Sequence, residues 1–203
     1  MGEVTIRRGE IADIPAVSAM LAQSFENDPE MAAIIPPPEQ RPERLQRMFA
    51  AQARHHYFPY GAVDLAFAGT QLLGAAMWAA PGHASPPPFA LARMVPEYAA
   101  ALGPHLWRGL RAEQVAQRYH PHYDHWYLYV IGASPAAQGR GVGRALLEHG
   151  LARADSAGDA AYLEATSPVN RRLYERFGFV ARDRIGGPGD DEGLTTMWRP
   201  ART

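Results

Sequence analysis

Residues 134–150, with the sequence SPAAQGRGVGRALLEHG, contain three glycines that alternate with other residues directly before a helical pattern begins. They follow residues 126–134 (WYLYVIGAS), an aromatic and β-branched strand pattern whose continuous apolar character indicates burial on both faces. A strand, a glycine loop and a helix in this order hold phosphate groups, because the unpaired amides and the dipole at a helix N-terminus favour an anion. The stretch therefore predicts a phosphate-bearing ligand on an α/β fold.

Two familiar phosphate loops are excluded by the residues that follow the glycines. The dinucleotide fingerprint needs a small residue where this chain has Arg144 or Leu146, which disfavours a nucleotide-binding oxidoreductase. The nucleoside-triphosphate loop needs a Gly-Lys-Ser/Thr ending, which is missing. The alternative to ligand binding is a glycine turn that only lets a helix pack on a sheet.

The composition is that of an ordinary globular protein. Of the 203 residues, 47% are apolar and 20% are charged, which suits one domain with a sizeable core. The net charge of -1 argues against a non-specific nucleic-acid binder, and the absence of cysteine excludes disulfides and cysteine nucleophiles. There is no signal-peptide pattern or membrane-length apolar run. We expect a cytoplasmic monomer or homodimer that binds neither nucleic acid nor membranes.

The other segments predict a sheet flanked by helices. A strand pattern, two helical patterns and an alanine-rich hairpin precede residues 84–125, which proline and glycine divide into short helices. We interpret 84–125 as a helical insertion between sheet strands that serves as a substrate wall, a lid or a spacer. After the glycine loop we expect a helix at about 142–154, a strand at 160–166 and a second helix. Two final strands enclose a turn-rich segment at 186–193.

The loop 138–143 (QGRGVG) resembles the Gln/Arg-x-x-Gly-x-Gly/Ala signature of the GCN5-related N-acetyltransferases, the GNAT superfamily. A second motif in 162–180 is similar to the region of that superfamily where an asparagine and a tyrosine lie on the helix after the next strand. Ser167 is a suitable N-cap for this helix, and Asn170 and Tyr174 share one of its faces because they are four residues apart. Two motifs in the right order identify the chain as a member of the superfamily.

The combined pattern, with its long insertion, is similar to the puromycin N-acetyltransferases and their relatives. The similarity is dense only from about Trp126 to Val180, and Ala133 stands where many members have valine. It implies one domain over 1–203 with a mixed, mostly antiparallel sheet that is splayed at the cofactor site and flanked by helices. It also implies acetyl-coenzyme A (acetyl-CoA) as co-substrate and a primary amine of a small molecule as acceptor. An antibiotic and an amino-acid-like compound are both compatible with this pattern.

The resemblance implies how acetyl-CoA is held. The pantetheine arm would pair with main-chain groups of Ile131, Gly132 and Ala133, and Gly132 would mark a bulge. Loop amides would bind the pyrophosphate, and Asn170 would lie toward the loop across the end of the sheet. The loop residues are Gln138, Gly139, Arg140, Gly141, Val142, Gly143 and Arg144. Arg140 and Arg144 either contact phosphate oxygens or remain solvated.

Acetyl transfer to an amine leaves two proton tasks to the protein. Tyr174 matches the superfamily's tyrosine near the sulfur, where it would be the general acid toward the leaving thiolate; the alternative is a core tyrosine. Glu164 is the first candidate for the base, because a carboxylate in an apolar strand is costly unless it is paired or faces a cleft. The alternative is an ion pair with one of the downstream arginines, Arg171, Arg172 or Arg182.

Phe25, Glu26 and Asp28 end the first helical pattern, where the superfamily's acceptor site commonly lies. The two carboxylates would be the base, bind a cationic amine or only cap a turn. The histidines in 120–125 (HPHYDH) form no evident metal-ligand set, and we expect no metal site. The rival class of function is a non-catalytic acyl-CoA-binding or sensing domain of the same fold.

Overall fold

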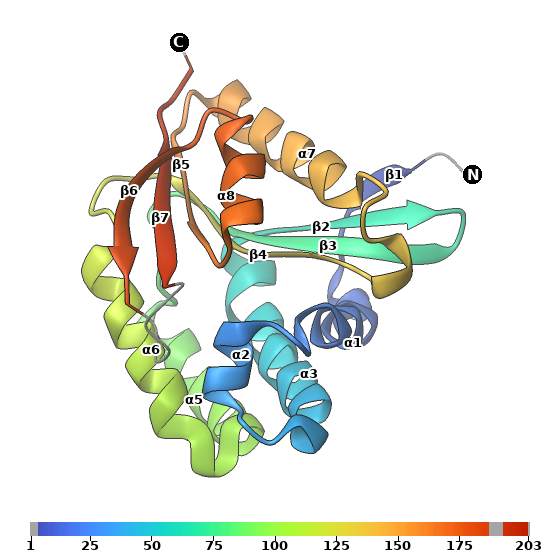
Figure 1. Ribbon diagram of the computed structural model, residues 1–203, viewed down its shortest axis with the longest axis vertical. Coiled ribbons are helices and arrows are strands. Elements are labelled where there is room, and N and C mark those ends of the chain that lie inside the picture. The colour runs from blue at the N-terminus through green and yellow to red at the C-terminus, as the bar shows by residue number, and fades with distance from the viewer. Residues whose placement is uncertain (1–3, 187–192, 203) are drawn as a thin grey trace.

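The computed structural model describes residues 4–186 and 193–202. Its centre is a seven-stranded sheet with the order β1-β2-β3-β4-β5-β7-β6 (Figure 1). Neighbouring strands are antiparallel except β4 and β5, which run parallel. The strands are β1 (Thr5–Arg8), β2 (Gly61–Ala68), β3 (Gln71–Ala79), β4 (Trp126–Ala133), β5 (Ala161–Ala165), β6 (Val180–Ile185) and β7 (Leu194–Arg199). The predicted mixed, mostly antiparallel sheet is confirmed.

Helices cover both faces of this sheet (Figure 1). The helices are α1 (Ile14–Phe25), α2 (Pro29–Ile34), α3 (Arg41–Gln52), α4 (Phe58–Tyr60), α5 (Pro88–Leu102), α6 (Leu106–Tyr119), α7 (Val142–Ala157) and α8 (Pro168–Glu175). α7 continues beyond the predicted end at Ala154, because the left-handed Gly158, with φ of 72°, provides its C-cap. None of the described helices has the length and apolar character needed to cross a membrane. The predicted turn at 186–193 falls, for 187–192, outside the described residues.

Side chains that alternate along β3 build a core on each face of the sheet. Ala75 and Met77 pack in the core with α1 and α3, whereas Ala76 and Trp78 pack in the core with α7. Successive strand residues point to opposite faces, so a central strand between two helical layers must be apolar throughout. This arrangement fixes α7 above the sheet and α1 below it.

β4 and β5 pair only near their first residues. Residues 126–128 pair with 161–163, and beyond them the two strands separate. At this point Tyr129 is an extra residue of β4, because Leu128 pairs with Trp78 and Val130 pairs with Met77. A bulge bends its strand and increases the local twist, which accounts for the separation. The sheet is therefore splayed, as the family resemblance implied.

The bulge predicted at Gly132 is wrong, because Gly132 pairs regularly with Ala75. Glycine is needed at position 132 for a different, steric reason. A Cβ at this position would lie 2.8 Å from Ser24 Oγ and 3.1 Å from atoms of Leu21 and Phe25. Gly132 thus lets α1 pack closely against the part of β4 that has separated from β5.

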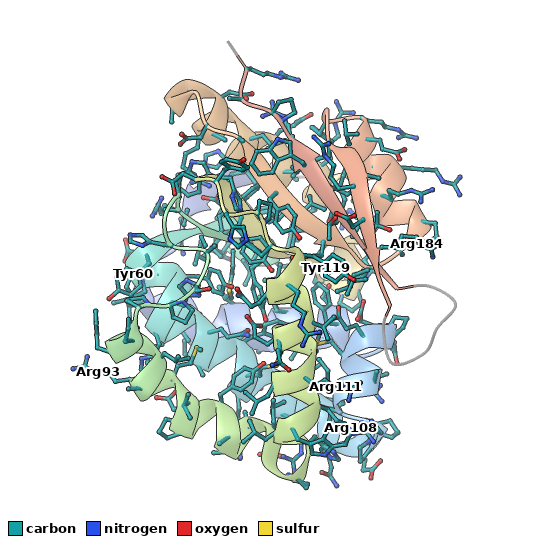
Figure 2. The ribbon with its side chains drawn as sticks, turned by 90° about the vertical axis from the view of Figure 1, so that its left-hand side faces the viewer. Tyr60, Arg93, Arg108, Arg111, Tyr119 and Arg184 are labelled. Atoms are coloured by element: carbon teal, nitrogen blue, oxygen red, sulfur yellow. The ribbon has the colours of Figure 1, made fainter. Side chains whose placement is uncertain are left out.

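The segment 84–125 contains α5 and α6. α5 packs against α3, and α6 packs against α2 as well as α5. Figure 2 views the molecule from the side on which α6 lies and labels Arg108, Arg111 and Tyr119 of this helix. The inner side of α6 is turned toward the split between β4 and β5, where it forms one wall of the site described next.

Candidate active site

A cavity lies where β4 and β5 separate, and α2, α6 and α8 close it from other sides. Its polar lining includes Asp28, Glu30, Glu113, Glu164, Asn170 and Tyr174. Its aromatic lining includes Phe25, Phe49, Tyr98, Tyr127 and Tyr129. The structure therefore brings together both predicted catalytic residues and two of the three predicted acceptor residues in one cavity.

Glu164 lies on β5 with its side chain only 9% exposed. Burial raises its pKa to about 7, and the nearby Tyr127 and Tyr162 hydroxyls offset this only in part. Within the described chain, neither Glu164 Oε1 nor the Tyr162 hydroxyl has a hydrogen-bond partner of ordinary geometry. A carboxyl group with this pKa is partly ionised at neutral pH, which suits a general base.

The alternative ion pair between Glu164 and an arginine is not formed among the described residues. Arg171 instead lies 3.6 Å from Glu175, one helical turn away on α8. The basic side chain nearest to Glu164 is His120, whose Nδ1 is 3.9 Å from Oε1. Burial, assisted by the neighbouring histidines, lowers the pKa of His120 to about 4, so this imidazole is neutral at neutral pH. Glu164 therefore has no fixed cation beside it in the described structure.

Hydrogen bonding orients the His120 ring. His125 Nδ1 lies 2.5 Å from the Tyr123 carbonyl oxygen, which only accepts, so this nitrogen carries the proton. His125 Nε2 is then an acceptor, and His120 Nε2 donates to it over 3.1 Å. This network assigns the lone pair of His120 Nδ1 to the side that faces Glu164. The structure thus places His120 beside the candidate base, with His125 behind it.

Tyr174 and Asn170 both reach the cavity from α8, as their spacing predicted. The helix begins where expected, because Ser167 Oγ accepts a hydrogen bond of 3.2 Å from the Asn170 amide. Tyr174 is buried, and its ring lies 6.0 Å from that of Phe179. Burial raises the pKa of the Tyr174 hydroxyl to about 12, so it stays protonated and able to donate. Tyr174 is thus both a core residue and a cavity residue.

The glycine loop precedes α7 and opens away from the protein. Gly139 and Gly141 have φ values of 73° and 80°, in the left-handed region that favours glycine. Gly143 has no such requirement, yet a Cβ at any of these three positions would meet no atom within 4 Å. Protein packing therefore does not explain Gly143, whereas a ligand that approaches the loop does. The amides at the start of α7 have no carbonyl partner one turn earlier and can face that ligand.

The remaining predicted cofactor residues lie along the same path. Ile131 lines the cavity, and the edge of β4 from 129 to 133 that faces β5 has no strand partner in the described sheet. Val142 is buried, so only its main chain can meet a ligand. Gln138, Arg140 and Arg144 are exposed beside the loop, and Arg144 donates to Glu148 over 2.8 Å.

Of the three predicted acceptor residues, Phe25 and Asp28 line the cavity and Glu26 does not. The carboxylate of Asp28 caps α2, accepting from the amides of Glu30 and Met31 at 3.0 and 3.1 Å. The alternative of a capping role is therefore realised for Asp28. The Glu26 carbonyl instead accepts a hydrogen bond from the buried Arg41.

Two carboxylates that line the cavity, Glu30 and Glu113, were not predicted from the sequence. Glu30 directly follows the Asp28-Pro29 pair. Whether its side chain reaches the cavity depends on where α2 packs, which the local sequence does not indicate. Burial and the nearby Asp28, Glu164 and Glu113 carboxylates raise the pKa of Glu30 to about 7. Glu113 lies on α6, and the small Gly109, Ala112 and Ala116 at helical spacing around it were the available signal.

These observations define a class of protein. An open β4 edge leads from a cavity that contains the candidate base and the candidate acid to a glycine loop at a helix N-terminus. That path suits a long ligand with a phosphate-rich end and a reactive group at the other end, as in an acyl-CoA. The residues present thus fit acetyl-CoA. This fit rests on two features alone, the open glycine loop and the unpaired edge of β4.

Comparison with known proteins places the chain in a family. The model of the acetyltransferase (GNAT) family matches residues 26–179, so the chain belongs to that family, and acetyl-CoA is its co-substrate. A Corynebacterium glutamicum structure described as histone acetyltransferase HPA2 and related acetyltransferase is 32% identical, with a TM-score of 0.76, and the match covers 100% of this chain and 98% of that chain.

Two further relatives show how far the similarity extends. A Drosophila melanogaster polyamine N-acetyltransferase shares the fold, with a TM-score of 0.65 at 18% identity over 97% of this chain and 99% of that one. A mycothiol acetyltransferase of Mycobacterium avium is 45% identical over 63 residues. That match spans 26% of this chain and only 20% of the relative. The subgroup of puromycin N-acetyltransferases stays a prediction.

Proposed function

We propose that the protein transfers the acetyl group of acetyl-CoA to a primary amine of a small molecule. One observation carries this proposal: Glu164 and Tyr174 line the same cavity at the split of β4 and β5. Their pKa values are raised by burial to about 7 and about 12, which suits one to accept a proton and the other to donate one.

The co-substrate, when bound, supplies a thioester carbonyl for attack by an amine. In the proposed mechanism, Glu164 accepts the proton that the amine loses, directly or through one water molecule. The Tyr174 hydroxyl gives a proton to the sulfur as the carbon–sulfur bond breaks. The main chain of 129–133 and the glycine loop hold the two reactants close together and in the right orientation. Such positioning supplies a large part of the rate enhancement. The amine is acetylated and free thiol is released, so protons and charge balance.

The relatives support a small amine as acceptor without identifying it. Polyamine and agmatine N-acetyltransferases share the fold at 18% and 19% identity. The resemblance to the puromycin N-acetyltransferases adds an antibiotic amine to the candidates. We therefore place puromycin, aminoglycosides, amino acids and aliphatic amines in one panel.

The test measures thiol release from acetyl-CoA with each amine of this panel, together with mass spectrometry of the acetylated product. We expect slow release without acceptor and a clear acceleration with at least one amine. Calorimetry with acetyl-CoA is run beside it. If acetyl-CoA binds but no amine accelerates thiol release, the non-catalytic acyl-CoA-binding alternative is correct and the proposed function is wrong.

A further inference from the structure

The cavity carries more negative charge than an acetyl transfer requires. Besides Glu164 on β5, it is lined by Glu30 on α2 and Glu113 on α6. These three carboxylates come from elements far apart in the sequence, so the fold brings them to one space. Among the described residues that line the cavity, none is arginine, lysine or histidine. The excess charge is therefore not neutralised by the cavity wall itself.

Glu113 belongs to the inner side of α6. Gly109, Ala112, Glu113 and Ala116 line the cavity at helical spacing, so one carboxylate stands among three small residues. The small residues leave space next to Glu113. Arg108 donates to the Ala33 carbonyl of α2 over 3.1 Å and is not part of the cavity lining, and Arg111 is exposed. The Gln117 side chain donates a hydrogen bond to Glu113 over 3.2 Å. Because Gln117 carries no charge, this contact does not neutralise a carboxylate.

The three carboxylates repel one another. Glu30 is faced by Asp28 at its own helix start, by Glu164 from β5 and by Glu113 from α6. Glu164 is faced by Glu113, by the hydroxyls of Tyr127 and Tyr162, and by neutral His120. The Glu164 side chain is buried and Glu30 is half-buried, whereas Glu113 is exposed. The cost of like charges therefore falls mainly on Glu164 and Glu30 unless a cation compensates them. Glu164 Oε1, on a side chain that is only 9% exposed, has no hydrogen-bond partner in the described chain and can accept from a cationic ligand.

We propose that the acceptor is an aliphatic amine with a second cationic group, such as a diamine or a guanidinoalkylamine. The second cation binds between Glu30 and Glu113 while the reacting amine lies at Glu164. Phe25, Phe49 and Tyr98 line the cavity and provide apolar contact for the methylene chain and aromatic faces for a cation. This inference rests on the proposed function, whose acceptor class it narrows.

The experiment compares three acceptors of similar length: 1,5-diaminopentane, pentylamine and 5-aminopentanoate. We expect kcat/KM to be at least about tenfold higher for the diamine than for pentylamine, as for one charge-assisted contact, and lowest for the aminopentanoate. Glu30→Gln and Glu113→Gln should each reduce the diamine-over-pentylamine ratio by about tenfold, mainly through KM. Glu39→Gln removes the same charge from an exposed position outside the cavity and should preserve the ratio.

Calorimetry of 1,5-diaminopentane with the acetyl-CoA-free protein separates this inference from the proposed function. Diamine binding should tighten between pH 6 and pH 8, because deprotonation of Glu30 and Glu164 provides the charges that the dication needs. It should weaken in Glu30→Gln and Glu113→Gln. If the diamine binds in this way but is not acetylated, the proposed function fails and the cation site stands. If pentylamine and the diamine are acetylated equally well, or both variants keep the wild-type ratio, the second cation site is wrong and the acetyltransferase remains.

Discussion

Asp64 on β2 and Glu164 on β5 are both carboxylates within apolar strands, but their surroundings differ. The Asp64 side chain is 0% exposed and accepts two hydrogen bonds from the Arg153 guanidinium, at 3.1 and 2.6 Å. Glu164 is almost as deeply buried, yet its basic neighbour is neutral His120 at 3.9 Å. One face of the sheet thus neutralises its buried charge within the chain, and the cavity does not.

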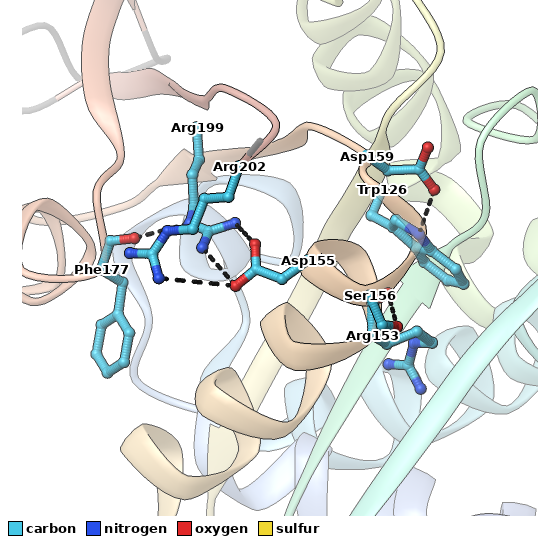
Figure 3. A network of polar contacts seen from close by, with 8 residues as sticks. All are labelled: Trp126, Arg153, Asp155, Ser156, Asp159, Phe177, Arg199 and Arg202. Carbon is cyan, nitrogen blue, oxygen red and sulfur yellow. Dashed lines mark hydrogen bonds and ion pairs between the residues drawn. The ribbon is translucent and has the colours of Figure 1, made fainter.

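A second paired charge strengthens this contrast. Figure 3 shows Arg199 of β7 bound through two nitrogens to Asp155 near the end of α7, at 2.7 and 2.8 Å. Arg199 Nε also donates to the Phe177 carbonyl oxygen over 2.9 Å. These contacts join α7, β7 and the turn after α8. They thereby stabilise the position of α8, the helix that carries Tyr174. Matched buried charges stabilise this fold, whereas the unmatched ones lie where we propose that a ligand binds.

Glu164→Gln removes the candidate base of the cavity and should have the largest effect. If Glu164 is the base, turnover with the best amine of the panel should fall about 10³-fold, within the usual range for acid–base catalysis. Acetyl-CoA affinity, measured by calorimetry, should stay within a few-fold of wild type. A variant that retains half of the wild-type turnover would show that another group accepts the proton.

Asp64→Asn tests the buried ion pair between Asp64 and Arg153. Removing one partner of a buried ion pair leaves the Arg153 charge without compensation, so the free energy of unfolding should fall by about 3 kcal/mol. Urea denaturation measures this change. Turnover per folded molecule should remain near wild type, because Asp64 pairs with α7 on the face away from the cavity. A loss below about 1 kcal/mol would contradict the structural role.

Tyr174→Phe tests the candidate general acid of the cavity. The substitution keeps the packing against Phe179 and removes the hydroxyl, so turnover should fall about 10²-fold if that group is the general acid. The melting temperature should change little. The opposite pattern, a lower melting temperature with turnover nearly intact, would show that Tyr174 acts only in packing.

The smallest expected effect is the pH dependence of stability. The folded-state pKa of Glu164, about 7, lies above the 4.5 of an unperturbed glutamate, so ionisation favours the unfolded chain. Below about pH 4.5 the group is protonated in both states and has no effect; its cost grows up to about pH 7 and is then constant. In paired urea titrations, the stability of Glu164→Gln relative to wild type should therefore increase as the pH rises from 4.5 to about 7 and then stay constant. A pH-independent difference would contradict the raised pKa.

Much of the cofactor side could be predicted because its signals are local. Glycine at 139 and 141 is required by backbone angles, and Ser167 caps α8 through its own neighbours. The spacing of Asn170 and Tyr174 within one helix placed both in the cavity. The acceptor side was predicted less well, because Glu26 points elsewhere and Glu30 and Glu113 were not foreseen. The roles of all these residues remain predictions that the experiments above address.

The order of the strands and of the longer helices, the glycine loop and the family could be read from the sequence, since each depends on residues that are close together in the chain. The point at which β4 leaves β5 depends on tertiary packing, because the bulge at Tyr129 is set by the register of β4 with β3. Only the tertiary structure also brought Glu30 and Glu113 to Glu164 and left that group without a fixed cation. Electrostatic interactions depend on distance and burial, and for segments far apart in sequence both are set by packing.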